Sequence, residues 1–517
     1  MTFEIVFVLL SLLGMMAALI ADKMRPGMVL FSVVVLFLCV GILTPKEMLE
    51  GFSNKGMITV ALLFLVSEGI RQSGTLGQVI KKLLPQGKTT VFKAQLRILP
   101  SVAFISAFLN NTPVVVIFAP IIKHWAKSVK LPATKFLIPL SYVTILGGIC
   151  TLIGTSTNLV VHGMILEAGY EGFTMFELGK VGIFIAIAGI IYLFIFSKRL
   201  LPDARPDTAV PDEKVEEGEK LHRVEAVLGA RFPGINKKLS DFNFQRHYGA
   251  EVKEIKTRNG QRYVDHLEDV VLREGDTLVV MADDTFIPTW GESSVFVLLT
   301  NGNDPDTSGK KKRWLALILL VLMIVGATVG ELPATKEMFP DIKLDMFFFV
   351  CITTIIMAWT NIFPARKYTK YISWDILITI ACAFAISKAM VNSGVADCVA
   401  GFIIGLSDDY GPHVLLAILF VITNLFTELI TNNAAAALAF PLALSISAQL
   451  GVSPTPFFVV ICMAASASFS TPIGYQTNLI VQGIGNYKFT DFVRIGLPLN
   501  IITFLISVIL IPLIWNF

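Results

Sequence analysis

The sequence predicts an all-α polytopic membrane protein with inverted repeats, re-entrant hairpins and broken helices, interrupted by a small inserted α+β cytoplasmic domain. Three observations support this prediction. The 517 residues are 54% hydrophobic and 16% charged, which is more apolar surface than a soluble chain can bury. Apolar runs near the roughly 20 residues that cross a bilayer recur along the chain. Three polar blocks also recur, in the same order, in its two halves.

The apolar runs extend from FEIVFVLLSLLGMMAALIA near the N-terminus to IITFLISVILIPLIWNF at the C-terminus, and we expect about ten crossings. The first run has no basic region before it and no small-residue cleavage site, so we interpret residues 3–21 as a retained span. The six cysteines lie in or beside apolar segments without a CxxC pair, which favours packing roles. The net charge of +3 gives no indication of nucleic acid as a partner.

Three parts follow from the change of composition along the chain. Residues 1–201 form the first membrane repeat, residues 202–313 a linker and a soluble domain with its core at about 219–290, and residues 314–517 the second repeat. The linker, LPDARPDTAVPDEKVEEGEK, is charged and contains prolines. Apolar alternation after it predicts short strands, with a hairpin around Asn259-Gly260.

The two halves share three polar blocks about 320 positions apart. The pairs are VSEGIRQSG (66–74) with ISKAMVNSG (386–394), FLNNTPVVVIFAP (108–120) with FTELITNNAAAALAFP (426–441), and GTSTNLVVHG (154–163) with GYQTNLIVQG (474–483). One common spacing and one common order indicate an internal repeat.

Basic loops predict the orientation of the chain. They place the N-terminus outside and the inserted domain in the cytoplasm. Basic residues flank residues 99–122 on both sides, which predicts a re-entrant hairpin, and GTSTN interrupts the next crossing in mid-membrane. An odd number of crossings before the second copy inverts it. Inverted repeats with broken helices are typical of secondary transporters.

We expect four polar interruptions to converge near the middle of the membrane, at residues 110–112, 154–158, 431–433 and 474–478. Side-chain and unwound backbone oxygens suit a small alkali cation. Free N–H groups at the half-helix starts suit the oxygens of an anion. None of the four motifs contains Lys or Arg, so a bound dianion would need countercharge from co-transported cations.

With these motifs the chain resembles the divalent-anion/sodium symporters, the family of sodium-coupled sulfate and dicarboxylate carriers. That family has Ser-Asn-Thr in each hairpin, where this chain has NNT at 110–112 and TNN at 431–433. The resemblance implies import of a divalent oxyanion with Na⁺, by elevator-type alternating access in a homodimer in the cell membrane, without an organic cofactor. The departures favour sulfate, with a dicarboxylate such as succinate or an anion sensor as alternatives.

The resemblance also implies roles for individual residues. Substrate would contact Asn111, Thr112, Asn432 and Asn433. The segments 155–157 and 475–477 would close round it, with Thr155, Ser156, Tyr475 and Gln476 as its nearest contacts there. The first sodium site would use Ser106, Asn110, Asn111 and Gly154. The second sodium site would use Thr427, Thr431, Asn432 and Gly474. Asn158, Asn478 and Glu428 would support these sites.

The inserted segment NFQRHYGAEVKEIKTRNG…LREGDTLVV resembles the C-terminal regulatory domain of RCK/TrkA potassium-transport proteins. This resemblance implies a cytoplasmic module that dimerises and binds a small regulatory ligand, which the residues do not identify. A potassium channel would need a filter such as TVGYG and a GxGxxG nucleotide fold, and the sequence contains neither.

Some polar residues leave alternatives open. Glu428 is either a proton-coupling carboxylate or a brace for the second hairpin. Glu68 and Lys388 occupy equivalent positions and either pair across the repeat axis or pair locally. His124 and His162 have no second ligand at metal-binding spacing, so we interpret them as structural. The spans contain no nucleophile–base pair, and we expect no enzyme activity.

Overall fold

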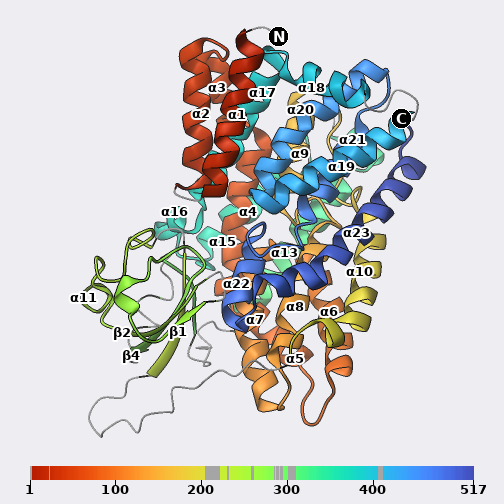
Figure 1. Ribbon diagram of the computed structural model, residues 1–517. Coiled ribbons are helices and arrows are strands. Elements are labelled where there is room, and N and C mark those ends of the chain that lie inside the picture. The colour runs from red at the N-terminus through yellow and green to blue at the C-terminus, as the bar shows by residue number, and fades with distance from the viewer. Residues whose placement is uncertain are drawn as a thin grey trace, which may run out of the picture.

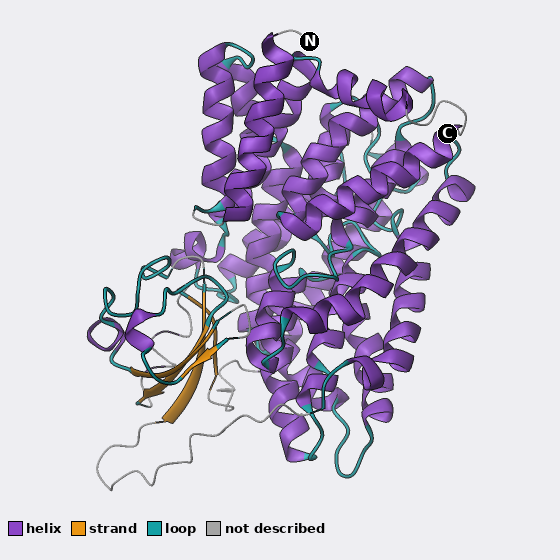
Figure 2. Cartoon of the chain, viewed as in Figure 1, coloured by secondary structure: helices purple, strands orange, loops and turns teal. Residues whose placement is uncertain are grey.

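The protein, as a computed structural model, is a bundle of long helices with a small sheet domain beside one half of it (Figures 1 and 2). The structure describes residues 3–21, 24–203, 222–229, 232–257, 261–283, 286, 290, 295–300, 310–339, 341–405 and 411–517. Within these ranges, eight helices are long and apolar enough to cross a membrane. This confirms the all-α polytopic prediction. Eight is fewer than the expected ten because several apolar helices are shorter than a full span, among them Pro26–Val40, Met346–Trp359 and the halves of the broken crossings.

The first repeat contains ten α-helices. They are α1 (Phe3–Ala21), α2 (Pro26–Val40), α3 (Pro45–Glu50), α4 (Lys55–Gln72), α5 (Thr75–Leu83), α6 (Val91–Ser106), α7 (Asn111–Ser128), α8 (Leu137–Gly148), α9 (Ser156–Glu167) and α10 (Gly179–Leu200). Short 3₁₀ turns occur at Gly51–Ser53 and Ala133–Lys135.

The second repeat follows the inserted domain. Its helices are α13 (Lys310–Gly330), α14 (Pro333–Met338), α15 (Met346–Trp359), α16 (Tyr368–Tyr371), α17 (Trp374–Asn392), α18 (Val395–Gly405), α19 (Gly411–Leu429), α20 (Asn432–Leu450), α21 (Thr455–Ser466), α22 (Gln476–Gly485) and α23 (Phe489–Ile514). A 3₁₀ turn at Ala365–Lys367 precedes α16.

The second repeat is inverted relative to the first. Helices α5, α6 and α7 lie at the lower end of the bundle in Figure 1, whereas α18 and α20 lie at the upper end. Likewise α9 lies in the upper half and α22 in the lower half (Figure 1). The α6–α7 and α19–α20 pairs are the two predicted hairpins, and the breaks lie between α8 and α9 and between α21 and α22.

The helices divide into two groups by their packing. In the scaffold group (α1–α4, α13, α15 and α17), α2 packs on α17, and α15 packs on both α4 and α13. In the site group (α6–α10 and α19–α23), α6 packs on α8, α19 on α21, and α10 on α23. The two groups meet where α17 packs on α20 and α4 packs on α9.

The inserted domain contains a five-stranded sheet of order β3-β2-β4-β1-β5. Its elements are β1 (His222–Leu228), α11 (Phe244–Tyr248), β2 (Glu251–Lys256), β3 (Arg262–Tyr263), β4 (Thr277–Ala282) and β5 (Phe296–Thr300), with a 3₁₀ turn at Leu267–Asp269. Strands β2 and β3 pair antiparallel, with Ile255 opposite Tyr263. The predicted hairpin is therefore present, while its turn at Asn259-Gly260 lies outside the described residues. A cluster of aromatic side chains around Phe232 forms the core of the domain.

Candidate functional site

The four predicted polar segments meet at one place in the site group. Helix α7 of the first hairpin packs on α22, which follows the second break, and α9, which follows the first break, packs on α20 of the second hairpin. Each hairpin therefore meets the broken helix of the opposite repeat. The helices α7, α9, α20 and α22 begin at Asn111, Ser156, Asn432 and Gln476, so their N-termini share this junction.

Asn111 lies at the centre of the first half of the site, with none of its surface exposed. We assign its amide so that the nitrogen lies 2.8 Å from Ser106 Oγ, 3.0 Å from Thr144 O and 3.2 Å from Gly154 O. Its oxygen then accepts a hydrogen bond from the Tyr475 hydroxyl at 2.5 Å. Three oxygens from three segments thus converge on one point.

Gly154 is required because the unwound segment folds back onto the end of α8. A Cβ atom added at Gly154 would lie 2.5 Å from Gly148 O and 2.7 Å from its Cα. No side chain fits at that distance, so the backbone carbonyl of Gly154 can reach Asn111 only if position 154 is glycine.

The second half of the site repeats the contact of a hydroxyl with both the asparagine amide and a backbone carbonyl. Thr427 Oγ1 lies 2.7 Å from Asn432 Oδ1 and 2.6 Å from Ala465 O, as Ser106 lies between Asn111 and Thr144 O in the first half. The Thr431 hydroxyl is buried without a hydrogen-bond partner in the described part of the chain. A Cβ at Gly474 would lie 2.6 Å from Thr427 O, so glycine is needed here too.

Contacts between the repeats bring the predicted substrate residues together. Thr112 Oγ1 donates to Gln476 Oε1 at 3.3 Å. Ser156 and Thr157 hydroxyls each donate to Asn433 Oδ1 at 3.3 Å. In addition, the hydroxyls of Thr155 and Tyr475 lie 3.2 Å apart. Thr157 lies in the segment 155–157 that the sequence places round the substrate, and it belongs to the Thr-Asn pair that both repeats share.

The Asn110 side chain makes no hydrogen bond to this network among the described residues. It precedes α7 without a side-chain capping hydrogen bond, and it lines a small cavity together with Ser67, Ser156 and Met323. The structure therefore brings Asn110 to the boundary between the site group and the scaffold group.

The supporting residues hold the unwound segments in place. Asn158 Nδ2 donates to Thr151 O at 2.9 Å, and Asn478 Nδ2 donates to Thr471 O at 3.1 Å. Glu428 accepts hydrogen bonds from the Ser470 and Thr471 amides at 2.8 and 2.9 Å, and from Asn500 Nδ2 at 2.8 Å. The bracing contacts expected of Glu428 are therefore present.

Glu68 pairs locally, with Arg71 at 2.6 Å and with Gln72 at 2.6 Å. Its equivalent Lys388 instead lines a cavity of about 1120 Å³ between α4, α9 and residues 330–347. The cavity is also lined by His162, and by acidic and basic side chains from several distant segments. Sequence reasoning missed this cavity because no single motif contains its residues.

Comparison with known proteins agrees with this architecture. The citrate transporter family model matches residues 16–446 and, in a second match, residues 338–517. An uncharacterized transporter of Synechocystis sp. is 29% identical over 94% of this chain and 93% of its own length. A putative sulfur deprivation response regulator of Chlamydomonas reinhardtii is 28% identical over 93% of this chain and 96% of its own.

The sodium/sulfate cotransporter 2 of the same alga is 30% identical over 54% of this chain, which corresponds to 31% of its own length. Residues 16–446 alone make up more than half of the 517 residues. The chain therefore belongs to the citrate transporter family.

Proposed function

We propose that this protein is a sodium-coupled symporter that imports a divalent oxyanion, sulfate above all, by elevator-type alternating access. The observation that carries the proposal is the junction of four half-helix starts and two sets of converging oxygens between the inverted repeats. Relatives named as transporters and as a sodium/sulfate cotransporter support it.

The converging oxygens support cation binding. Ser106 Oγ, Thr144 O and Gly154 O all lie within 3.2 Å of the Asn111 amide nitrogen. A cation bound beside the amide would have these three hard oxygens as ligands, and rotation of the amide would turn the Asn111 oxygen toward it as a fourth. Thr427, Asn432 and Ala465 O offer the equivalent set in the second repeat.

The helix starts support anion binding beside the cations. Free N–H groups and positive dipole ends of α7, α9, α20 and α22 face the junction. Hydroxyl and amide groups of Thr112, Ser156, Asn433 and Gln476 can donate to anion oxygens. Because these donors are neutral, the co-bound cations supply the countercharge that lets a dianion cross the membrane.

Two alternatives have support of their own. The description of the family as citrate transporters favours a carboxylate, whereas the relative named as a sulfur deprivation response regulator favours anion sensing. Sulfate fits the donor set better, because short hydroxyl and amide groups from all four segments lie within hydrogen-bond distance of one another across the junction.

Unequal packing on the two sides of the membrane supports alternating access. Helix α4 packs on α9 and α17 packs on α20, but among the described residues α22 makes no comparable packing against α17. A Cβ at Gly56 would lie 2.7 Å from Leu159 O, and Asn54 Nδ2 donates to Gly163 O at 3.3 Å. The site group thus packs against the scaffold on the α9 side, beside the cavity of about 1120 Å³ described above, and in our proposal it opens on the α22 side.

In this proposal the scaffold group forms a homodimer in the cell membrane, and the inserted RCK/TrkA-type domain faces the cytoplasm. Sodium-gradient-driven uptake of radiolabelled sulfate into proteoliposomes tests the function, with succinate, citrate, thiosulfate and molybdate as competitors. We expect sulfate uptake that requires Na⁺ and is blocked best by thiosulfate or molybdate. Stronger competition by succinate or citrate would reassign the substrate, and anion binding without uptake of any anion would favour the sensor.

A further inference from the structure

We propose that the inserted domain covers a face of α22 that scaffold helix α17 contacts in the opposite transport state. While the domain is bound there, α17 cannot pack on α22, and the site stays open on the side of the membrane where the domain lies. This inference rests on the alternating access proposed above. It concerns one surface, the face of α22 that carries Leu479 and Gly483. Two parts of this chain, the inserted domain and α17, compete for that surface.

The first contact is between residues 274–277 of the inserted domain and α22. A Cβ added at Gly483 would collide with Thr277 Oγ1 and would lie 3.7 Å from Thr277 Cβ. One helical turn earlier, the Leu479 side chain lies within 4 Å of a Cβ position at Gly275, whose φ of +84° allows the tight turn. The inserted domain therefore approaches α22 closely at Gly483, where the helix has no side chain.

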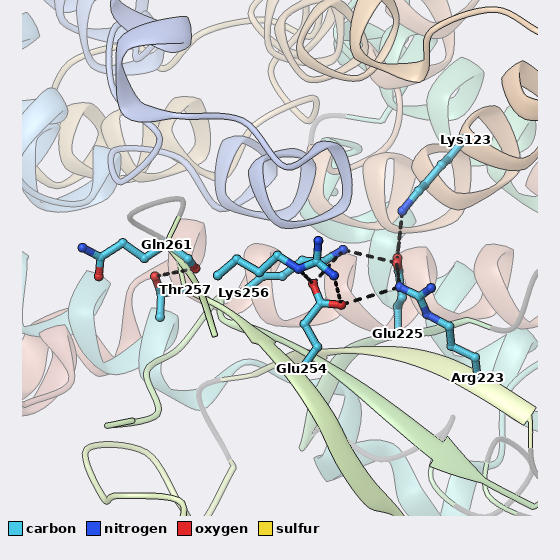
Figure 3. A network of polar contacts seen from close by, with 8 residues as sticks. Lys123, Arg223, Glu225, Glu254, Lys256, Thr257 and Gln261 are labelled. Atoms are coloured by element: carbon cyan, nitrogen blue, oxygen red, sulfur yellow. Dashed lines mark hydrogen bonds and ion pairs between the residues drawn. The ribbon is translucent and has the colours of Figure 1, made fainter. Parts of the chain in front are cut away.

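The second contact is an ion pair with α7. Figure 3 shows Lys123 extending from α7 toward Glu225, and the two charged groups are 3.0 Å apart. Both side chains are largely buried, with exposed fractions of 22% and 14%. Glu225 also lies 3.6 Å from Lys256, which is itself buried. Strand β5 touches α7 as well.

These two contacts hold the elements that carry the site. Helix α7 begins with Asn111 and Thr112, and α22 begins with Gln476. Both belong to the site group, so any movement of that group against the scaffold must either carry the inserted domain with it or break both contacts.

The repeat symmetry identifies the competing occupant. Gly483 in GYQTNLIVQG corresponds to Gly163 in GTSTNLVVHG, and α17 corresponds to α4. Gly163 packs against the scaffold, since its Cβ position lies 3.3 Å from Gly56 Cα. The symmetric contact would place Gly483 against Ile376 of α17, which is 320 positions after Gly56. In this structure the inserted domain occupies Gly483 instead.

The contact between the inserted domain and α22 leaves buried polar groups without hydrogen-bond partners in the described part of the chain, as expected of a contact that forms and breaks. The Gln482 amide, next to Gly483, is 2% exposed, and neither its nitrogen nor its oxygen has a hydrogen-bond partner among the described residues. The buried Thr277 hydroxyl likewise has none. Buried polar groups without partners cost free energy, so they weaken this contact and favour its exchange for another.

A disulfide between the two surfaces tests the inference. The 3.7 Å between Thr277 Cβ and the Cβ position at Gly483 lies within the range for disulfides, so Thr277→Cys with Gly483→Cys should cross-link in the full chain after its six native cysteines are replaced. We expect oxidation to reduce sodium-driven sulfate uptake about tenfold or more, and thiol reduction to restore it. Failure to cross-link, or full uptake by the cross-linked protein, would overturn the proposal.

Loss of the ion pair provides the complementary test. Lys123→Ala should raise the initial uptake rate several-fold, whereas Lys127→Ala, an exposed lysine one helical turn away on α7, should leave it unchanged. A Leu479→Cys reporter should react faster with a membrane-impermeant maleimide in the Lys123→Ala background. Unchanged labelling would contradict the contact between the inserted domain and α22. Faster labelling without faster uptake would contradict the proposal that this contact slows transport. Labelling does not need uptake, so it still reports on the contact if the proposed transport function fails.

Discussion

At the scale of single residues, the candidate site depends on small neutral groups in buried positions. Asn111 and Asn432 each have a hydroxyl residue five positions before them, Ser106 and Thr427, within hydrogen-bond distance. An amide can present either its oxygen or its nitrogen by rotating. The amide oxygen can therefore coordinate a cation when a cation is bound. When no cation is bound, the amide nitrogen can donate hydrogen bonds to the carbonyl oxygens.

Thr427→Val should weaken sodium binding. The change keeps the volume but removes a hydroxyl that lies 2.7 Å from Asn432 Oδ1 and 2.6 Å from Ala465 O. A buried polar group that loses its partner costs about 1–3 kcal/mol, so we expect the sodium concentration for half-maximal uptake to rise about tenfold. Ser101→Ala, which removes a hydroxyl bonded only within α6, is the matched control. An unchanged sodium dependence would contradict the assignment.

The ion pair between Lys123 and Glu225 should be insensitive to pH in the neutral range. Burial alone would raise the pKa of Glu225, but Lys123, Lys256 and Arg223 outweigh it and lower the pKa from 4.5 to about 2. A carboxylate whose pKa is lowered by folding contributes stability above its unfolded pKa, and this contribution is lost as the pH falls toward the folded value.

We therefore expect the difference in melting temperature between the unmodified protein and Lys123→Ala to stay constant from about pH 5 to pH 8 and to shrink below about pH 4.5. Thermal unfolding of the detergent-solubilised proteins measures it. A difference that already declines between pH 8 and pH 6 would mean that another group controls the contact.

At the scale of elements, the breaks in α8–α9 and α21–α22 are the decisive local features. Each break is shaped by a glycine that approaches backbone closely, Gly154 in the first repeat and Gly474 in the second. Each is also held by an asparagine, Asn158 or Asn478, that bonds to carbonyl oxygens of the unwound segment. Irregular backbone at membrane depth needs such internal partners.

Gly154→Ala should abolish most transport. Its Cβ would lie 2.5 Å from Gly148 O, so the unwound segment would have to shift and withdraw the Gly154 carbonyl from Asn111. We expect uptake to fall about tenfold or more, with a loss of stability of a few kcal/mol, as is typical of overpacking. Gly14→Ala on α1, where a Cβ meets nothing within 4 Å, should leave uptake unchanged. Near-normal uptake by Gly154→Ala would argue against a role for this carbonyl.

At the scale of the whole molecule, two repeats of similar structure pack unequally. The scaffold contacts α9 through Gly56 and Gly163 but makes no comparable contact with α22 among the described residues. In the proposed alternating access, the sequence relation between the repeats means that each unequal pair of contacts represents one end of the cycle and predicts the other.

The symmetric contact can be trapped directly. A disulfide between Ile376→Cys and Gly483→Cys should form during sodium-driven turnover, and it should form several-fold faster when Lys123→Ala releases the inserted domain. Gel mobility under non-reducing conditions measures it. If it never forms under turnover, α17 does not reach Gly483 and the symmetry argument is wrong.

Several features of the protein were predictable from sequence because they are encoded locally. Hydropathy predicts the spans, the spacing of repeated blocks predicts the internal repeat, and the basic loops with an odd number of crossings predict its inversion. Polar residues such as Asn111 and Asn432 predict the four segments of the site. Alternation between turn residues predicted the strands of the inserted domain. These patterns are readable without coordinates because hydrocarbon penalises any unsatisfied polar group within it.

The partners of those residues depended on the tertiary structure. Only the packing of α7 on α22 and of α9 on α20 shows that Asn111 meets Tyr475 and that Thr157 meets Asn433. The sequence also could not predict three other features: the local pairing of Glu68 with Arg71, the large charged cavity, and the contact of Thr277 with Gly483. The physical reason is that sequence patterns specify which face of an element is apolar or polar, whereas contacts between distant segments depend on how whole helices cross.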